Sequence, residues 1–144
     1  MVASNKELAV EYVDVMWNQH DFQAGLAYLT PELAASQAAA HVTELLAAFP
    51  DLRVEILEPG PIAEGDHVVL RVAATGTHDS ADFAGMHPSG RRIRWESIRI
   101  FRFDQGRIAE TWAMQDRLGL MEQLGAVESR AGKVTWAAGG NKPS

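Results

Sequence analysis

The feature that most constrains this fold is a change in the spacing of apolar residues at Pro50. Before Pro50, apolar side chains recur every three or four residues, as they do on one face of a helix. After it they alternate with polar side chains, as they do in strands with one buried face. A block of helices followed by a run of antiparallel strands predicts an α+β fold, in which the helices cover one face of a curved sheet.

Three helices are expected before the proline, and each has a recognisable start. Ser4 and Glu7 form a capping-box pattern, which predicts that the first helix begins near Asn5. Asp21 can cap a second, shorter helix, and a third begins near Gln37. Proline has no backbone N–H to continue the helical hydrogen bonds, so the third helix should stop before it.

The strands expected after the proline cover Leu52–Ile56, His67–His78, Ile93–Phe103 and Arg107–Met114. One face of the second strand carries Val68, Leu70, Val72, Ala74 and His78. A turn at Asp104-Gln105-Gly106 joins the last two strands, because glycine accepts the positive φ that such turns need. A closing helix is expected over Asp116–Leu124, ended by Gly125.

The third of these strands changes the parity of its apolar residues along its length. Ile93 and Trp95 occupy odd positions, whereas Ile98 and Ile100 occupy even ones. If all four side chains faced the core, the strand would need an extra residue between the two pairs. The pattern therefore predicts a bulge or a strong bend near Glu96–Ser97.

Length and charge limit the domain count, the partners and the compartment. The 144 residues suit one domain, expected over 1–128, followed by a flexible tail of small and polar residues over 129–144. The net charge of −6 argues against nucleic acid as a partner, since phosphate binding needs a concentrated basic surface. Without an apolar leader or a membrane-length apolar run, the chain is expected to be cytoplasmic and free of the membrane.

Common catalytic and cofactor motifs are missing from the chain. It has no Gly-x-Gly-x-x-Gly, no phosphate loop, no Gly-x-Ser-x-Gly elbow and no His-Glu-x-x-His. Its five histidines are scattered without the short spacing of metal ligands, and it has no cysteine. We therefore predict no metal site, and the sequence offers no support for a nucleotide, hydrolase-triad or zinc-protease site.

Three stretches carry a resemblance to a known family. These are Phe49-Pro50-Asp51-Leu52, Gly85-Met86-His87-Pro88-Ser89-Gly90 and the hairpin with its closing helix over Gly90–Gly125. Together they make the chain similar to the SnoaL-like polyketide cyclases, or ester cyclases, of the nuclear-transport-factor-2-like superfamily. The resemblance implies a cone-shaped α+β barrel with a hydrophobic cavity between sheet and helices. It also implies a homodimer formed by packing sheets.

The same resemblance implies an intramolecular aldol closure that needs no cofactor, in which a pocket carboxylate moves the proton. Ala113 occupies the position that matches the cyclase aspartate, and Arg99 occupies a position where a cyclase can have a histidine. The carboxylates that remain nearby are Asp116 and Glu96. Asp116 can instead cap the closing helix, and Glu96 can instead pair with an arginine on the strand surface. Our candidate catalytic residues are Asp116 and Glu96 for acid/base transfer and Arg99 for stabilising an enolate or alkoxide.

A further group of residues is expected to touch a small apolar ligand, although each could equally be core or loop: Trp17, His78, Phe83, Met86, His87, Trp95 and Trp112. The leading hypothesis is an enzyme of the lyase or isomerase type, which cyclises or isomerises an aromatic or polyketide-like carbonyl compound. Two alternatives stay open. One is a noncatalytic protein that binds hydrophobic ligands, and the other is a hydroxylase-like or epoxide-hydrolase-like branch of the family.

Overall fold

The computed structural model describes residues 3–126, 136–138 and 141–142. Its helices are α1 (Asn5–Tyr12), the π-helix η1 (Val13–Asn18), α2 (Phe22–Leu26), α3 (Pro31–Ala34), α4 (Gln37–Ala48) and α5 (Arg117–Leu124). Its strands are β1 (Arg53–Ile56), β2 (Ile62–Glu64), β3 (His67–His78), β4 (Arg91–Asp104), β5 (Arg107–Gln115), β6 (Trp136–Ala138) and β7 (Asn141–Lys142). Among the described helices, none combines the length and apolar character needed to cross a bilayer.

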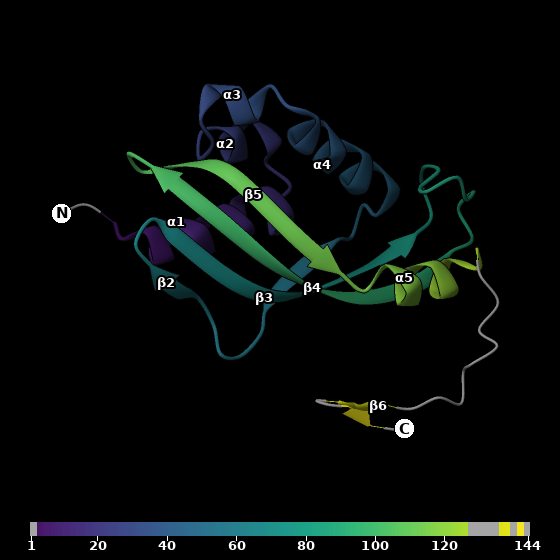
Figure 1. Cartoon of the computed structure of the whole chain (residues 1–144). Coiled ribbons are helices and arrows are strands. Elements are labelled where there is room, and N and C mark those ends of the chain that lie inside the picture. The colour runs from purple at the N-terminus through teal and green to yellow at the C-terminus, as the bar shows by residue number, and fades with distance from the viewer. Residues whose placement is uncertain (1–2, 127–135, 139–140, 143–144) are drawn as a thin grey trace.

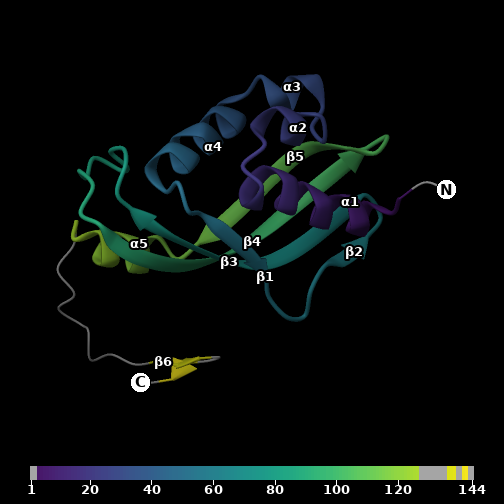
Figure 2. The ribbon, with the colours of Figure 1, turned by 180° about the vertical axis from the view of Figure 1, so that it is seen from behind.

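The main sheet is antiparallel and curved, and the helices α1 to α4 lie over one of its faces (Figures 1 and 2). Its strands run in the order β1-β3-β4-β5, and β2 pairs with the first residues of β3. The predicted α+β class, with helices on one face of a curved antiparallel sheet, is confirmed.

The predicted helix starts are confirmed by their hydrogen bonds. The Ser4 hydroxyl accepts from the backbone N–H of Glu7, whose carboxylate accepts from the N–H of Ser4. The Asp21 carboxylate accepts from the N–H of Ala24 at the start of α2. The short helix α3 and the π-helical turn after α1 were not expected, because neither has a distinct apolar period of its own.

The core lies between the concave face of the sheet and the helices. On β3 the even-numbered residues from Val68 to His78 are buried, as predicted. They meet a helical layer that includes Met16, Leu45 and Phe49. The hairpin between β4 and β5 also follows the sequence, with Gln105 and Gly106 at positive φ.

The sequence predicts a bulge or a strong bend near Glu96–Ser97, and the bulge is wrong. The pairing of β3 with β4 is continuous from His67 opposite Arg102 to His78 opposite Arg91. The irregularity lies instead between Arg102 and Phe103, in the pairing of β4 with β5. Because the register does not change, Ile98 and Ile100 point away from the core, on the outer face of the sheet.

Two features close the ends of the helix layer over the sheet. At one end, Leu29 bridges Ile108 on β5, and the N–H of Ile108 donates to the Tyr28 carbonyl at 2.8 Å. At the other end, the loop over 79–90 folds back onto β3. There the backbone carbonyl of His78 accepts hydrogen bonds from the backbone N–H groups of Ser89 and Gly90. Within the predicted tail, β6 pairs with β7, and the rest of 127–144 lies outside the described residues. The domain boundary at 128 therefore stays a prediction.

Candidate functional site

A cavity of about 250 Å³ lies between the helices and the concave face of β4 and β5. Most of its lining is apolar or aromatic, and the aromatic part consists of Tyr12, Trp17, Phe83, Trp95 and Phe101. Its polar groups are the Tyr12 hydroxyl and the side chains of Arg99, Thr111, Gln115 and His41. Concave sites with an apolar wall and a few convergent polar groups are the usual form of small-molecule sites.

Arg99 is a charged residue on the row of β4 that faces the helices. Its neighbours in that row, Ser97 and Phe101, are buried against the core. The guanidinium lies over the face of Trp17, with its central carbon 5.3 Å from the ring centroid, which is a cation–π geometry. Among the described residues, no carboxylate forms an ion pair with Arg99. Burial lowers its pKa, because the apolar surroundings disfavour the charged form.

Tyr12 places a second hydrogen-bond donor on the cavity wall. Its side chain is buried, and burial raises the pKa of its phenol to about 12, against a smaller opposing effect of the Arg99 charge. The phenol therefore stays protonated at neutral pH and can donate to a ligand oxygen. Within the described part of the chain, the Tyr12 hydroxyl has no hydrogen-bond partner. It is not fully enclosed by protein atoms, so a ligand can reach it. Arg99 and Tyr12 together make the inner wall favourable for a ligand that carries negative charge or a strong acceptor.

The mouth of the cavity lies between α4 and β5. His41 on α4 and Ala113 on β5 both line the cavity and are both solvent-exposed. Ala113 is the register partner of Arg99, so their side chains leave the sheet on the same face, one strand apart. The methyl group of Ala113 leaves the space beside Arg99 without an opposing carboxylate.

A family model described as SnoaL-like polyketide cyclase matches residues 7–124. The chain belongs to the SnoaL-like polyketide cyclase family. No protein of curated function matches the sequence.

Solved structures agree with this membership. The SnoaL-like chain is similar to AclR, a proposed hydroxylase from Streptomyces galilaeus, at 28% identity and a TM-score of 0.77, over 87% of this chain and 83% of AclR. It is similar to a proposed polyketide cyclase from Acidithiobacillus ferrooxidans at 27% identity and a TM-score of 0.72, over 86% of this chain and 96% of that one. It is also similar to TsrD from Streptomyces laurentii at 25% identity and a TM-score of 0.73, over 88% of this chain and 99% of TsrD.

Glu96 does not line the cavity of this SnoaL-like chain. Glu96 follows Trp95 on β4, and successive side chains of a strand point to opposite faces. Since Trp95 faces the core, the side chain of Glu96 lies on the outer face of the sheet. There its two carboxylate oxygens accept from Arg71 at 3.0 Å and from Arg94 at 2.9 Å. The hydrogen bond from Arg94, followed by that from Arg71, lowers the pKa of Glu96. The structure thus gives Glu96 the ion-pairing role that was the alternative to catalysis.

Asp116 also lies outside the cavity lining. It is the N-cap of α5, and its carboxylate accepts from the backbone N–H of Gly119 at 3.0 Å. Neither Asp116 nor Glu96 shares the cavity with Arg99. The pairing of aspartate or glutamate with Arg99, on which an epoxide-hydrolase-like reaction would depend, is not present among the cavity residues.

The residues expected to bind ligand divide into two groups. Trp17, Phe83 and Trp95 line the cavity. The other four do not line it. His78 is buried, with its Nε2 2.7 Å from the Ala81 carbonyl oxygen, and Met86 packs on the core. His87 is exposed and pairs with Asp82, and Trp112 lies on the outer face of the sheet. Because side chains alternate between the two faces of a strand, Trp112 points to the other face of β5 from its neighbours Thr111 and Ala113.

Sequence reasoning missed four polar lining residues: Tyr12, His41, Thr111 and Gln115. Thr111 and Gln115 could have been found from strand parity, because they share the face of Ala113 on β5. Tyr12 lies on the buried face of α1, and nothing in the spacing of the sequence marks its hydroxyl as a site group. His41 stands among alanines, and only the packing of α4 over the sheet brings it to the cavity. Among the described residues, no three His, Asp or Glu side chains come together in a way that could hold a metal ion.

Proposed function

We propose that this protein binds a compact aromatic, polyketide-like carbonyl compound in the cavity and catalyses its cyclisation or isomerisation. The step that the protein would assist is formation of an enolate or alkoxide, whose oxygen Arg99 stabilises. The carrying observation is that Arg99 lines an aromatic cavity and has no carboxylate partner among the described residues. The reaction needs no metal or organic cofactor.

The chemical argument rests on the cost of an unpaired charge. A buried guanidinium loses hydration, and a protein usually recovers that cost through an ion pair. Around Arg99, the cation–π contact with Trp17 recovers only part of it. A ligand oxygen that becomes negative during reaction would recover more, and a cationic group already in place stabilises such an oxygen without further rearrangement.

The volume of the cavity supports a compact ligand. Drug-sized ligands occupy sites of roughly 300–1,000 Å³, and this cavity is slightly smaller, at about 250 Å³. The ring faces of Trp17, Trp95 and Phe83 suit one or two flat rings. We therefore propose a substrate with one or two aromatic rings in the cavity and an oxygen directed at Arg99.

A binding measurement tests the role of Arg99. Isothermal titration would compare 2-naphthoate with the uncharged 2-naphthalenemethanol, in the wild-type protein and in Arg99→Met. The wild type should bind the carboxylate more tightly, and Arg99→Met should lose roughly 10- to 100-fold of that affinity, as expected for a hydrogen bond to a charged group. Arg92→Met is the matched control, since Arg92 is on the same strand and its side chain is exposed on the other face. Equal 2-naphthoate affinity in the wild type and Arg99→Met would reject the proposal.

A second candidate function is noncatalytic binding of the same kind of ligand. It is favoured by the absence of Asp and Glu from the described cavity lining. The two functions differ in turnover: chromatography of polyketide-like ketones incubated with the protein would show a product only for the enzyme. The similarity to AclR suggests a third outcome, a product that has gained an oxygen atom, which would favour hydroxylation.

We also propose that the protein forms a homodimer through the outer face of the sheet. Apolar side chains gather there on three neighbouring strands: Val69, Ile98, Ile100, Trp112 and Met114, here called the outer strip. Ile98 is 50% exposed and Met114 is 78% exposed. Ion pairs of Arg71 with Glu96 and of Arg102 with Glu110 flank the outer strip, which resembles the apolar centre and polar rim of an interface.

A further inference from the structure

We propose that His41 is the group that takes and returns the proton in this cavity, and that Glu44 is its positioning residue. The inference rests on the proposed function, because it assigns the base for an enolate that Arg99 would stabilise. It concerns a residue on a helix over the sheet, whereas the carboxylates first considered lie on the strand β4 and at the end of β5.

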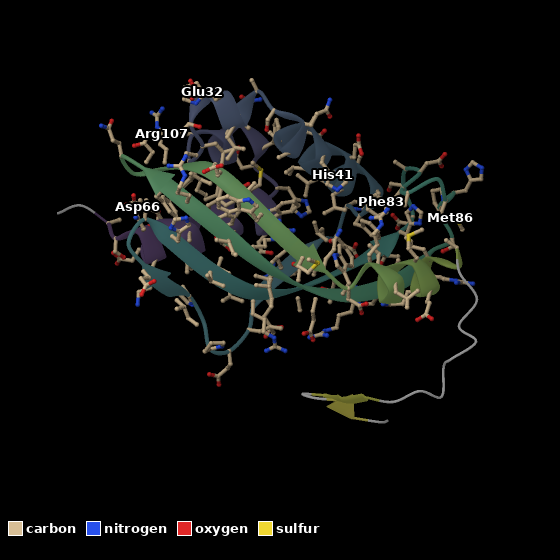
Figure 3. The ribbon with its side chains drawn as sticks, viewed as in Figure 1. Glu32, His41, Asp66, Phe83, Met86 and Arg107 are labelled. Carbon is tan, nitrogen blue, oxygen red and sulfur yellow. The ribbon has the colours of Figure 1, made fainter. Side chains whose placement is uncertain are left out.

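His41 lies on α4 at the mouth of the cavity, and its ring is close to Phe83 in the loop over 79–90. Its ring centroid is 6.3 Å from that of Phe83, and both residues line the cavity. Figure 3 shows the two side chains approaching one another from α4 and from the loop. Phe83 is buried, and His41 is exposed. The imidazole therefore lies beside an aromatic wall and remains accessible to water.

Elimination among the lining residues leaves His41 as the base. Arg99 stays cationic, and the pKa of Tyr12 is raised to about 12 by burial, so neither accepts a proton at neutral pH. The described cavity lining contains no Asp and no Glu. Histidine is the side-chain type whose charge changes between about pH 5 and 8, which makes it the commonest general base.

Glu44 places a carboxylate near the imidazole of His41. Its carboxylate oxygen Oε2 lies 3.5 Å from Nδ1 of His41, one helical turn along α4. A carboxylate at Nδ1 favours the tautomer with hydrogen on that atom, which leaves Nε2 as the proton acceptor. Glu44 and His41 are the residue types of an orienting carboxylate and a base, and their 3.5 Å separation is longer than the hydrogen bond that joins such pairs in other catalytic sites.

The other charged side chains on the elements around His41 either pair with another residue or lie away from His41. Asp82, in the loop that carries Phe83, pairs with His87 at 2.9 Å. Glu32, on the helix α3 that packs beside α4, lies far from His41 in Figure 3. Arg99 faces the cavity from β4, and among the described residues it forms no ion pair with a carboxylate.

The proposed step conserves atoms and charge. Nε2 of His41 takes a proton from the carbon next to the ligand carbonyl, and the electron pair of that C–H bond forms the enolate double bond. The carbonyl π pair moves to oxygen, beside Arg99. In an isomerisation the imidazolium returns the proton to carbon; in an aldol closure the enolate carbon attacks a second carbonyl, and the new alkoxide takes the proton.

Deuterium exchange into 2-tetralone tests this step, because the probe has two fused rings and an enolisable carbonyl. NMR in dilute buffered D₂O would give the rate above the buffer background. We expect His41→Gln to lower the protein-dependent rate by roughly 100-fold, the scale of general base catalysis, and to remove its decline toward acid pH. Glu44→Gln should lower the rate less and move the pH profile. Added imidazole should restore His41→Ala, and the matched control His87→Gln should behave as wild type.

The outcomes separate this inference from the proposed function. If His41→Gln exchanges 2-tetralone as fast as wild type, or if the wild type gives no exchange above background while it still binds 2-naphthoate, the role of His41 is rejected and the Arg99 site stands. If Arg99→Met binds 2-naphthoate as well as wild type, the proposed function itself is rejected. Loss of exchange in His41→Gln with unchanged 2-naphthoate binding and with imidazole rescue of His41→Ala would support both.

Discussion

Arg99 and Ala113 are register partners on β4 and β5, and both side chains line the cavity. The resemblance to the cyclases places their catalytic carboxylate at the position of Ala113. In this protein a methyl group stands there instead, beside a cation whose pKa burial has lowered. The cavity thus differs from a carboxylate site in the sign of its charge, and the predictions below follow from that difference.

Ala113→Asp should create an ion pair with Arg99, because directly opposed side chains on neighbouring strands have Cβ atoms about 5 Å apart. The new carboxylate would compete with an anionic ligand, so 2-naphthoate should bind at least ~10-fold more weakly in a titration. Arg99 would hold the pKa of the new Asp below its unfolded value. Its contribution to stability should therefore be present at neutral pH and be lost as the pH falls below about 4. Ala113→Asn is the uncharged control, and equal behaviour of the two variants would contradict the prediction.

Arg99→Met should weaken anion binding without weakening the fold. The change removes a poorly hydrated cation from an apolar wall, and it also removes the contact with Trp17. These effects oppose one another, so the free energy of unfolding should stay within about 1 kcal/mol of wild type or rise above it. Urea unfolding without ligand measures this. A loss of several kcal/mol would mean that Arg99 is mainly a structural residue.

Glu96→Gln and Asp116→Asn should each keep the protein-dependent exchange of 2-tetralone within about twofold of wild type, because neither carboxylate lines the cavity. Asp116→Ala should cost about 1 kcal/mol of stability, since it removes the cap on the N–H of Gly119. Asparagine can also cap a helix, so Asp116→Asn should lose less. A large loss of exchange in a folded Glu96→Gln or Asp116→Asn protein would return that carboxylate to the reaction.

Asp51→Asn should make the unfolding free energy less dependent on pH. The backbone N–H of Thr77 donates to one oxygen of Asp51 at 2.7 Å, and the Thr77 hydroxyl donates to the other at 2.8 Å. The backbone hydrogen bond is the main reason why the pKa of Asp51 is lowered. A lowered pKa gives stability that is present above the unfolded value, about 3.9, and lost as the pH falls through the folded value.

The wild type should exceed Asp51→Asn by about 1 kcal/mol near neutral pH, a modest figure because the carboxylate is nearly half exposed. Urea titrations near neutral pH and well below the unfolded pKa would measure the difference at each pH. It should shrink on acidification, and a difference that grew instead would contradict the assignment.

Ile98→Lys should convert a dimer into a monomer while the fold is retained. The substitution places a charge in the centre of the outer strip, where burial against a second copy would be costly. Sedimentation velocity gives the oligomeric state, and circular dichroism gives the fold. Val10→Lys is the matched control, because Val10 is an exposed apolar residue on α1, which lies over the other face of the sheet (Figure 2). A monomeric wild type would reject the proposed homodimer.

Most of the fold could be predicted because its signals are local. A capping box, an apolar period and a glycine at positive φ depend on residues close together in the chain, and Ser4, Gly106 and Gly125 behave as their positions predict. The bulge could not be judged locally. Apolar residues at both parities of β4 fit a bulge, and they fit equally well a regular strand with two apolar faces.

The candidate site, like the fold, has features that the sequence predicts and features that depend on packing. The sequence alone determined the α+β class and identified Arg99 and three aromatic residues that line the cavity, and the resemblance to the cyclases implies that Ala113 stands at the position of their carboxylate. Only the tertiary structure decided that Glu96 and Asp116 lie outside it and that Tyr12 and His41 lie on its wall. Neighbouring residues on a strand point to opposite faces, and a helix residue reaches the sheet only through the packing angle of its helix. Cavity membership is therefore decided by contacts between segments far apart in the chain.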